Sequence, residues 1–271
     1  MLNFFRFWRE QGWISISEDE YRKAWLQFGG SVITHPDFVE QLSDLAGIQP
    51  RYLGRVDGAG VQAAIAVWGH DLALSKDGLK RHGKRRLFDL GNAEVIFPQA
   101  SDVTVMLRHR MQFVSELHEN RAKGLKIQPQ ELALLREPED YSKKFRYNQR
   151  REQRLLEEQG GEIVSFTELS SSEQARIYSE LFEKRWGFET PGKAKLTEVL
   201  VLLRDYIVGD FICINGQPAA AQILYRVESP DWISVEYING GVDPAFNELS
   251  PGSVLTWVNT QKQWELAREQ G

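Results

Sequence analysis

The stretch WISVEYINGGVDPAFNELSPGSVLTWVNTQKQWELAREQG, from Trp232 to Gly271, decides the fold that we expect. It begins as a β-type run, passes through a loop rich in Gly, Asp, Asn and Pro, and enters a long helical pattern at Ser250-Pro251. A strand that feeds a helix N-terminus can hold an anion, because the N–H groups of the first turn have no partner within the helix. We therefore expect the ligand site at this junction.

Composition indicates a folded protein without a membrane span. The chain has 271 residues, of which 42% are hydrophobic and 26% are charged, and this length suits one large domain or two of ordinary size. The net charge of -5 argues against indiscriminate nucleic-acid binding but leaves room for a local basic patch. No apolar run reaches the roughly 18 residues of a membrane helix, and no secretory signal is present. We expect a cytoplasmic protein.

Residues 1–15 are expected to form an amphipathic N-terminal helix. Arg6, Arg9 and Glu10 occupy one side of the helical wheel, and an apolar set occupies the other, namely Met1, Leu2, Phe4, Phe5 and Trp8. Two interpretations stay open. The helix either docks on the body of the protein, or it rests through residues 1–13 on an anionic surface of the inner membrane.

Two hairpin patterns indicate an internal repeat. Arg51–Val56 and Val61–Trp68 flank a Gly-containing turn, as do Asp210–Ile214 and Pro218–Arg226, and in each pair the second strand is rich in alanine. Helical patterns precede both hairpins. We infer two copies of one α/β module.

The module boundaries that we expect are 16–135 and 136–271. Each module should be a mostly antiparallel mixed sheet flanked by helices, which gives a mixed α+β (α/β) fold class. Within the first module, the apolar residues between Val103 and Leu117 predict a helix.

The segment YSKKFRYNQRREQRLLEEQ, residues 141–159, predicts a helix with a basic face. At about 100° per residue, six cations fall within an arc of roughly 160°, and these are Lys143, Lys144, Arg146, Arg150, Arg151 and Arg154. Phe145, Leu155 and Leu156 lie opposite and should pack. A merely solvated face is one interpretation, and contact with a phosphate or polyanion is the other.

The sequence lacks the motifs of several other kinds of functional site. There is no Ser-His-Asp order and no phosphate-binding P-loop. No metal-ligand spacing occurs, since His109 and His118 fall nine apart, so we expect no metal. The basic helix lacks the setting of a DNA-reading helix, and we do not expect sequence-specific DNA binding.

The order hairpin, strand 233–238, loop and Pro251 helix resembles the GNAT acyltransferase superfamily. That resemblance implies a loop of form Gln/Arg-x-x-Gly-x-Gly/Ala before a helix that holds the pyrophosphate of coenzyme A. Here the window is Asn247-Glu248-Leu249-Ser250-Pro251-Gly252, in which Gly252 fits, Asn247 replaces Gln or Arg, and Ser250 replaces the first Gly. A further strand follows this helix in GNAT proteins, and the chain stops at Gly271, so we expect either that the C-terminal module is truncated or that its final strand is absent.

The tandem arrangement resembles the Fem-like branch of these transferases, and four blocks resemble the Mig-14 family. The blocks are GGSVITHPDF (29–38), KKFRYNQRRE (143–152), LFEKRWGF (181–188) and WISVEYINGGVDP (232–244). The Mig-14 resemblance implies a role in resistance of Gram-negative pathogens to cationic antimicrobial peptides, at the inner membrane. The family has also been described as a transcriptional activator.

These resemblances imply transfer of an acyl or aminoacyl group from acyl-CoA or aminoacyl-tRNA to an amine. The alternative is a non-catalytic, membrane-peripheral or regulatory protein on the same scaffold. Glu236 and Tyr237 are the catalytic candidates. Glu236 would act as a base for the amine, or else pair with an arginine such as Arg185. The candidate donor-binding residues are Arg185, Trp186, Asn247, Ser250, Gly252 and Ser253. Ser250 should also cap the helix, and Asn239-Gly240-Gly241 should form a ligand-wrapping loop.

Overall fold

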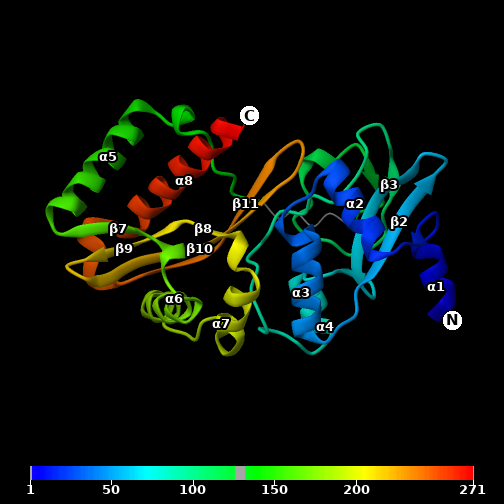
Figure 1. Cartoon of the computed structure of the whole chain (residues 1–271), viewed down its shortest axis with the longest axis horizontal. Coiled ribbons are helices and arrows are strands. Elements are labelled where there is room, and N and C mark those ends of the chain that lie inside the picture. Colours follow the sequence, from blue (N-terminus) through cyan, green and yellow to red (C-terminus); the bar gives the residue numbers. More distant parts are fainter. Residues whose placement is uncertain (1, 126–131, 271) are drawn as a thin grey trace. The chain divides into compact units, whose positions relative to one another are not determined.

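The computed structural model describes residues 2–125 and 132–270, which form two compact units. Unit 1 comprises residues 1–132 and 226–236, and unit 2 comprises 133–225 and 237–271. The mixed α+β fold with mostly antiparallel sheets is confirmed. Figure 1 shows the elements of each unit.

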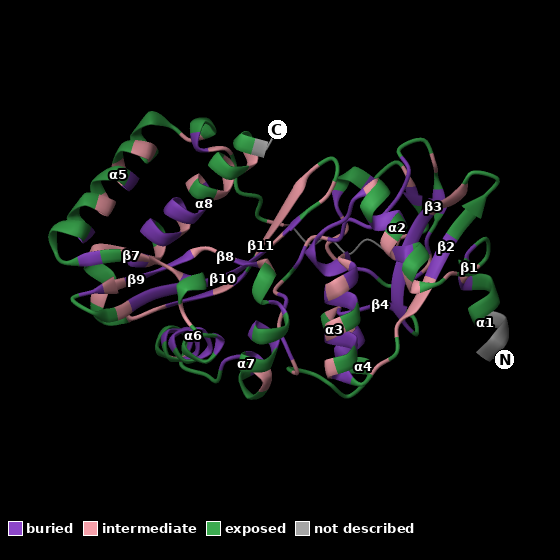
Figure 2. Ribbon diagram, viewed as in Figure 1, coloured by how far each residue is buried: buried purple, intermediate pink, exposed green. Residues whose placement is uncertain are grey.

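Unit 1 is built on a four-stranded sheet of order β1-β2-β3-β4, in which every neighbouring pair is antiparallel. Tyr21 and Trp25 of α2 and Phe38 of α3 are fully buried, as is most of β3 (Figure 2). In chain order, the elements that start in this unit are α1 (Leu2–Arg9), β1 (Ile14–Ser15), α2 (Glu18–Phe28), η1 (Val32–Thr34), α3 (Pro36–Ala46), β2 (Arg51–Asp57), β3 (Gly60–Trp68), β4 (Asp71–Leu72), α4 (Lys76–Arg81), β5 (Val105–Met106), η2 (Glu116–His118) and β6 (Ala122–Lys123).

Unit 2 contains a sheet of order β11-β10-β9-β7, with the short strand β8 also paired to β10. Helices α5 and α8 lie on one face of the sheet, and α6 and α7 lie on the other (Figure 1). The elements are η3 (Pro138–Asp140), α5 (Lys143–Glu158), β7 (Gly161–Ser165), η4 (Phe166–Glu168), α6 (Ser171–Trp186), α7 (Lys193–Leu202), η5 (Arg204–Tyr206), β8 (Ile207–Val208), β9 (Asp210–Ile214), β10 (Gln217–Glu228), β11 (Ile233–Val242), η6 (Pro244–Leu249) and α8 (Pro251–Gln270).

The main elements recur in the same order in both units. The order helix, strand, two helices, three strands and helix describes α1-β1-α2-α3-β2-β3-β4-α4, and it also describes α5-β7-α6-α7-β9-β10-β11-α8. The two sheets place their corresponding strands in the same sequence as well. The similarity of the two hairpins therefore extends to whole modules.

One feature of the division was not predicted. The tip of the β10-β11 hairpin, residues 226–236, belongs to unit 1. Trp232 donates from its indole nitrogen to the Gly30 carbonyl at 3.0 Å, and the Ser234 hydroxyl accepts from the Val32 N–H at 3.3 Å. The hairpin tip is thus held by specific hydrogen bonds to the first part of the chain.

The helix expected over Val103–Leu117 is wrong. This segment is extended and contains β5, which pairs in parallel with β6. Its buried residues alternate, since Val105, Leu107, His109 and Met111 are buried. A period of two is the mark of an extended chain, and it outweighs the number of apolar residues.

The N-terminal helix is shorter than the expected 1–15. It ends at Arg9, and β1 begins at Ile14 after Gly12, which adopts a left-handed φ of 83°. Met1 and the side chains of Leu2, Phe4 and Phe5 lie outside the described part of the molecule. Farther along, the predicted basic helix is confirmed as α5, whose first turn is capped by the Ser142 hydroxyl.

Candidate functional site

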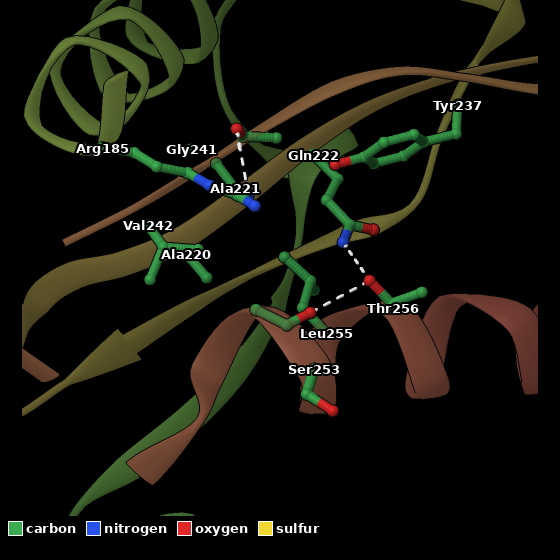
Figure 3. A pocket seen from close by; sticks show the side chains of 12 residues that line it. Arg185, Ala220, Ala221, Gln222, Tyr237, Gly241, Val242, Ser253, Leu255 and Thr256 are labelled. Atoms are coloured by element: carbon green, nitrogen blue, oxygen red, sulfur yellow. Dashed lines mark hydrogen bonds between the residues drawn. The ribbon is translucent and has the colours of Figure 1, made fainter. Parts of the chain in front are cut away.

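Unit 2 contains a pocket of about 230 Å³ between the end of α6, strands β10 and β11, and the first turn of α8 (Figure 3). Most residues around it are small or polar, Val242 and Leu255 are apolar, Arg185 is cationic, and none carries a carboxylate. The lining residues are Arg185, Ala220, Ala221, Gln222, Tyr237, Gly240, Gly241, Val242, Gly252, Ser253, Leu255 and Thr256. The pocket lies where the sequence places the strand-to-helix junction.

Two glycines allow the surrounding elements to approach β11 closely. A Cβ on Gly241 would lie 2.4 Å from the backbone nitrogen of Phe182, so only glycine lets α6 pack here. A Cβ on Gly252 would lie 2.8 Å from a methyl group of Val242. The absence of a side chain at Gly252 therefore lets the start of α8 pack against β11. The expected loop over Asn239-Gly240-Gly241 is wrong, because these residues are part of β11. The glycines matter here because they leave space for neighbouring backbone, and not because of unusual backbone angles.

A buried hydrogen-bond network fixes the floor of the pocket. Gln222 donates to the Thr256 hydroxyl at 2.6 Å and accepts from Asn259 at 3.0 Å. Thr256 in turn donates to the carbonyl of Gly252 at 3.0 Å, as Figure 3 shows. Asn259 also accepts from the Asp210 N–H at 2.9 Å. This network ties the first turn of α8 to β10, so the shape of the pocket is set before any ligand binds.

Arg185 and Tyr237 line the pocket, and Trp186 contacts Arg185. The Arg185 guanidinium lies 4.7 Å from the centre of the Trp186 ring, and both side chains reach the carbonyl of Gly240 at 3.5 Å and 3.4 Å. Trp186 is not among the lining residues and is 46% exposed. The Tyr237 hydroxyl points toward Gln222 in Figure 3. Burial raises the pKa of this phenol, and the Arg185 charge opposes the shift, so Tyr237 is protonated at neutral pH.

The loop between β11 and α8 has little capacity for a phosphate. The amides of Ala245 and Phe246 donate to Asp243, and the amides of Ser253 and Val254 both donate to the Ser250 carbonyl. Pro251 has no N–H. In the described part of the chain, Gly252 is the one residue of this first turn whose N–H has no acceptor.

Ser250 departs from its expected role as a helix cap. Its backbone is left-handed, with φ 48° and ψ 42°, whereas an N-cap residue is normally extended. It is the carbonyl of Ser250 that receives the first hydrogen bonds of α8, and not its hydroxyl. Ser250 and Asn247 do not line the pocket, whereas Gly252 and Ser253 do. Asp243 pairs with Lys184 at 2.6 Å, which lowers the pKa of its carboxyl and fixes the turn.

Helix α5, which carries the predicted basic face, contacts the pocket through its opposite, buried side. Its buried side is formed by Leu156 and Gln149, and Gln149 exchanges hydrogen bonds of 3.2 Å and 3.3 Å with Ser253, a lining residue. The six predicted cations lie on the other side. Five are exposed, Arg146 is half-buried, and none forms an ion pair with an acid among the residues that the structure describes. The face is therefore available to a polyanion.

Glu236 is not one of the residues that line the pocket. It belongs to unit 1, where its carboxylate accepts from the Glu94 N–H at 2.9 Å. Burial raises the pKa of Glu236 to about 8, and the nearby Glu94 carboxylate adds to this shift despite the opposing hydrogen bond. The Glu236 carboxyl group thus accepts a hydrogen bond from a backbone amide, and not from Arg185. Neighbouring residues of a strand point to opposite faces, and of Glu236 and Tyr237 only Tyr237 lines the pocket.

Sequence reasoning missed Gln222, Thr256 and Asn259. A glutamine inside the apolar run AAAQILY was the available signal, since a polar residue there needs a buried partner. Thr256 and Asn259 are three apart on one helix face, which is the spacing that such a partner pair requires.

Within the described ranges 2–125 and 132–270, no three His, Cys, Asp or Glu side chains lie close enough together to form a metal site. No helix within them combines the length and apolar character needed to cross a bilayer.

Comparison with known proteins gives one family. No curated protein matches the chain significantly. The sequence profile of Mig-14 matches residues 35–271, which is most of the chain and includes all of unit 2. The chain therefore belongs to the Mig-14 family.

Proposed function

We propose that unit 2 transfers an acyl or aminoacyl group to an amine, with the reactive end of the donor in the pocket beside α8. The observation that carries this proposal is the pocket itself, which lies between β10, β11 and the first turn of α8. The order of strand, loop and helix around it is the one that the resemblance to acyltransferases implies. The wider role, resistance to cationic antimicrobial peptides, rests on that family resemblance alone.

The hydrogen bonds of the loop favour aminoacyl-tRNA over acyl-CoA as the donor. A pyrophosphate needs several amides directed at it. The amides of Ser253 and Val254 are committed to Ser250, and Pro251 has none, so Gly252 offers a single N–H. A donor that is held elsewhere, through a large polyanionic carrier, does not need such a loop.

The basic face of α5 supports the same choice. The Gln149–Ser253 hydrogen bonds join α5 directly to the pocket. A nucleic acid that lies along Lys143, Arg150 and Arg154 would therefore have its end close to the first turn of α8. Neutralising several phosphates in this way gives binding that weakens steeply with salt.

The proposed reaction forms one amide bond and breaks one ester bond. The amine nitrogen attacks the carbonyl carbon, the ester oxygen leaves, and a proton passes from the amine to that oxygen. Tyr237 is protonated at neutral pH and can donate to the leaving oxygen. Glu236 stays a prediction as the base, since it lies outside the pocket residues.

Equilibrium binding to the full chain tests the proposal. The ligands are a non-hydrolysable aminoacyl-tRNA, in which an amide replaces the ester, and acetyl-CoA. The test variant is Arg150→Glu with Arg151→Glu, and the matched control reverses two exposed cations that are paired elsewhere in unit 2, Arg176→Glu with Lys195→Glu.

We expect tRNA affinity to fall at least tenfold in the test pair and to change little in the control pair. We also expect acetyl-CoA to bind weakly to all three proteins. Tight acetyl-CoA binding together with unchanged tRNA affinity would refute the choice of donor.

A second candidate function is attachment to an anionic membrane surface without catalysis. The observation in its favour is the outward position of Phe7 and Trp8 on α1, which are 76% and 53% exposed. Flotation with anionic vesicles, compared between the full chain and a chain lacking residues 1–13, tests it. Equal flotation of the two chains contradicts a role for the N-terminal helix.

A further inference from the structure

Helix α1 is attached to unit 1 through its polar side. Arg9 is only 7% exposed, and its Nη1 lies 2.5 Å from Nδ1 of His70. The Glu10 carboxylate accepts two hydrogen bonds from Arg51, at 2.9 Å and 2.8 Å. Phe7 and Trp8, by contrast, are largely exposed. Among the side chains that the structure describes, this helix is therefore attached by charged and hydrogen-bonding groups, which include a hydrogen bond of 2.6 Å from Arg108 to the Trp8 carbonyl.

A buried imidazole lies in the same region. His109 is 2% exposed, and neither of its ring nitrogens has a hydrogen-bond partner in the described part of the chain. The Nε of Arg9 is buried in the same way. An imidazole without an acceptor nearby has nothing to stabilise a positive charge, so His109 must be neutral while this arrangement lasts.

The charges around the two histidines are mostly positive. Besides His70 and His109, the charged groups that act on them or on Arg9 come from α1 and the residue after it, β2, β4, α4 and the extended segment after β5. The cations are Arg6, Arg9, Arg51, Arg81 and Arg110, and the acids are Glu10 and Asp71. Glu10 pairs with Arg51 and Arg6 and also lies 3.7 Å from the Arg9 guanidinium, and Asp71 pairs with Arg81.

We propose that His70 and His109 form an acid-sensitive latch, which holds α1 on unit 1 near neutral pH and releases it when the two imidazoles take up protons. A protonated His70 has no acceptor nitrogen for Arg9, so the 2.5 Å hydrogen bond becomes a repulsion between two cations. A protonated His109 adds a second unpaired charge among the same arginines. Departure of α1 removes Arg9 and opens the cluster to water.

The direction of the effect follows from the two histidine pKa values. Burial lowers the pKa of His109 to about 4, and the charge of Arg9 adds to the shift; burial and Arg9 also lower the pKa of His70. Release restores the ordinary pKa of 6.5, so protons favour the released state as the pH falls below 6.5. His109 alone then changes the ratio of released to docked helix roughly 30-fold between pH 7.5 and 5.0.

Hydrogen exchange of the full chain at pH 7.5 and 5.0 tests the latch. After correction for the intrinsic pH dependence of exchange, protection of the amides of residues 3–12 should fall about 30-fold at pH 5.0, while the amides of β3 stay protected. Glu10, whose pKa is held near 2 chiefly by Arg51, stays ionised over this range and does not confuse the result.

Variants separate the latch from other causes. His70→Gln keeps an acceptor for Arg9 but cannot take up a proton, and His109→Leu removes the second site. The double variant should lose the pH response, His70→Gln alone should reduce it, and His82→Gln, at an exposed position outside the cluster, should keep it. Unchanged protection in the unaltered protein, an equal response in the double variant, or a parallel loss of protection in β3 would each overturn the proposal.

Discussion

Replacement of Gly241 by alanine should destabilise unit 2 strongly. The added Cβ would lie 2.4 Å from the Phe182 nitrogen and 2.5 Å from the Leu181 carbonyl carbon, and real Cβ atoms essentially never come within 3.0 Å of another atom. Both obstacles are backbone atoms inside a helix, so no side-chain rotation can relieve the clash. Overpacking of a tight site costs about 1–3 kcal/mol, and we expect the upper end of that range, which changes the unfolding equilibrium roughly 100-fold.

The assay is urea denaturation of the full chain, with hydrogen exchange of α6 and β11 amides as the reading for unit 2. Gly58→Ala is the matched control, because no atom lies within 4 Å of its added Cβ. That control should be neutral or slightly stabilising. If Gly241→Ala unfolds at the same urea concentration as the unaltered protein, the close contact between α6 and β11 is wrong, and the wall of the pocket with it.

Three further predictions concern other parts of the molecule. Leu156→Ala should lower the free energy of unfolding, measured by urea denaturation, by about 2–5 kcal/mol because Leu156 is fully buried. Leu155 is 40% exposed, so Leu155→Ala should lower it by less than about 1 kcal/mol. Equal effects of the two substitutions would contradict the orientation of α5. The raised pKa of Glu236, about 8 against an ordinary 4.5, means that its contribution to stability is complete below pH 4.5 and is lost as the pH rises through 8. Glu236→Gln should remove that decline and be more stable than the unaltered protein at pH 9 by on the order of a few kcal/mol, and parallel stability curves from pH 5 to 9 would refute this. Thr256→Val should cost about 1–3 kcal/mol in thermal unfolding because Gln222 loses its buried acceptor, and an unchanged melting temperature would count against the network.

Local patterns in the sequence predicted the helices that carry strong end signals. Ser170 and Glu173, three apart in the sequence before an apolar run, form a capping box at the start of α6, and the basic face of α5 lies opposite the buried Leu156. In both cases the signal lies within one turn or one face of a helix, so no distant contact decides it.

Features that depend on distant contacts were not predictable in the same way. The hairpin tip at Trp232 belongs to unit 1 because of its hydrogen bond to Gly30, and these residues are about 200 positions apart in the chain. Likewise, neighbouring residues of a strand such as Glu236 and Tyr237 point to opposite faces, but the sequence does not say which of the two faces the pocket. The segment around His109 was misassigned for a different reason, since its period of two was present in the sequence and was outweighed by a count of apolar residues.

The central claim is that the pocket beside α8 and the basic face of α5 bind one ligand, an aminoacyl group on a polyanionic carrier. A hydrogen-exchange footprint with the non-hydrolysable aminoacyl-tRNA tests it most directly. We expect protection of residues 251–256 and 143–154 in the same titration, with the same midpoint, and loss of both on raising the salt concentration. Protection of 251–256 by acetyl-CoA alone, or protection of 143–154 without any change at 251–256, would contradict it.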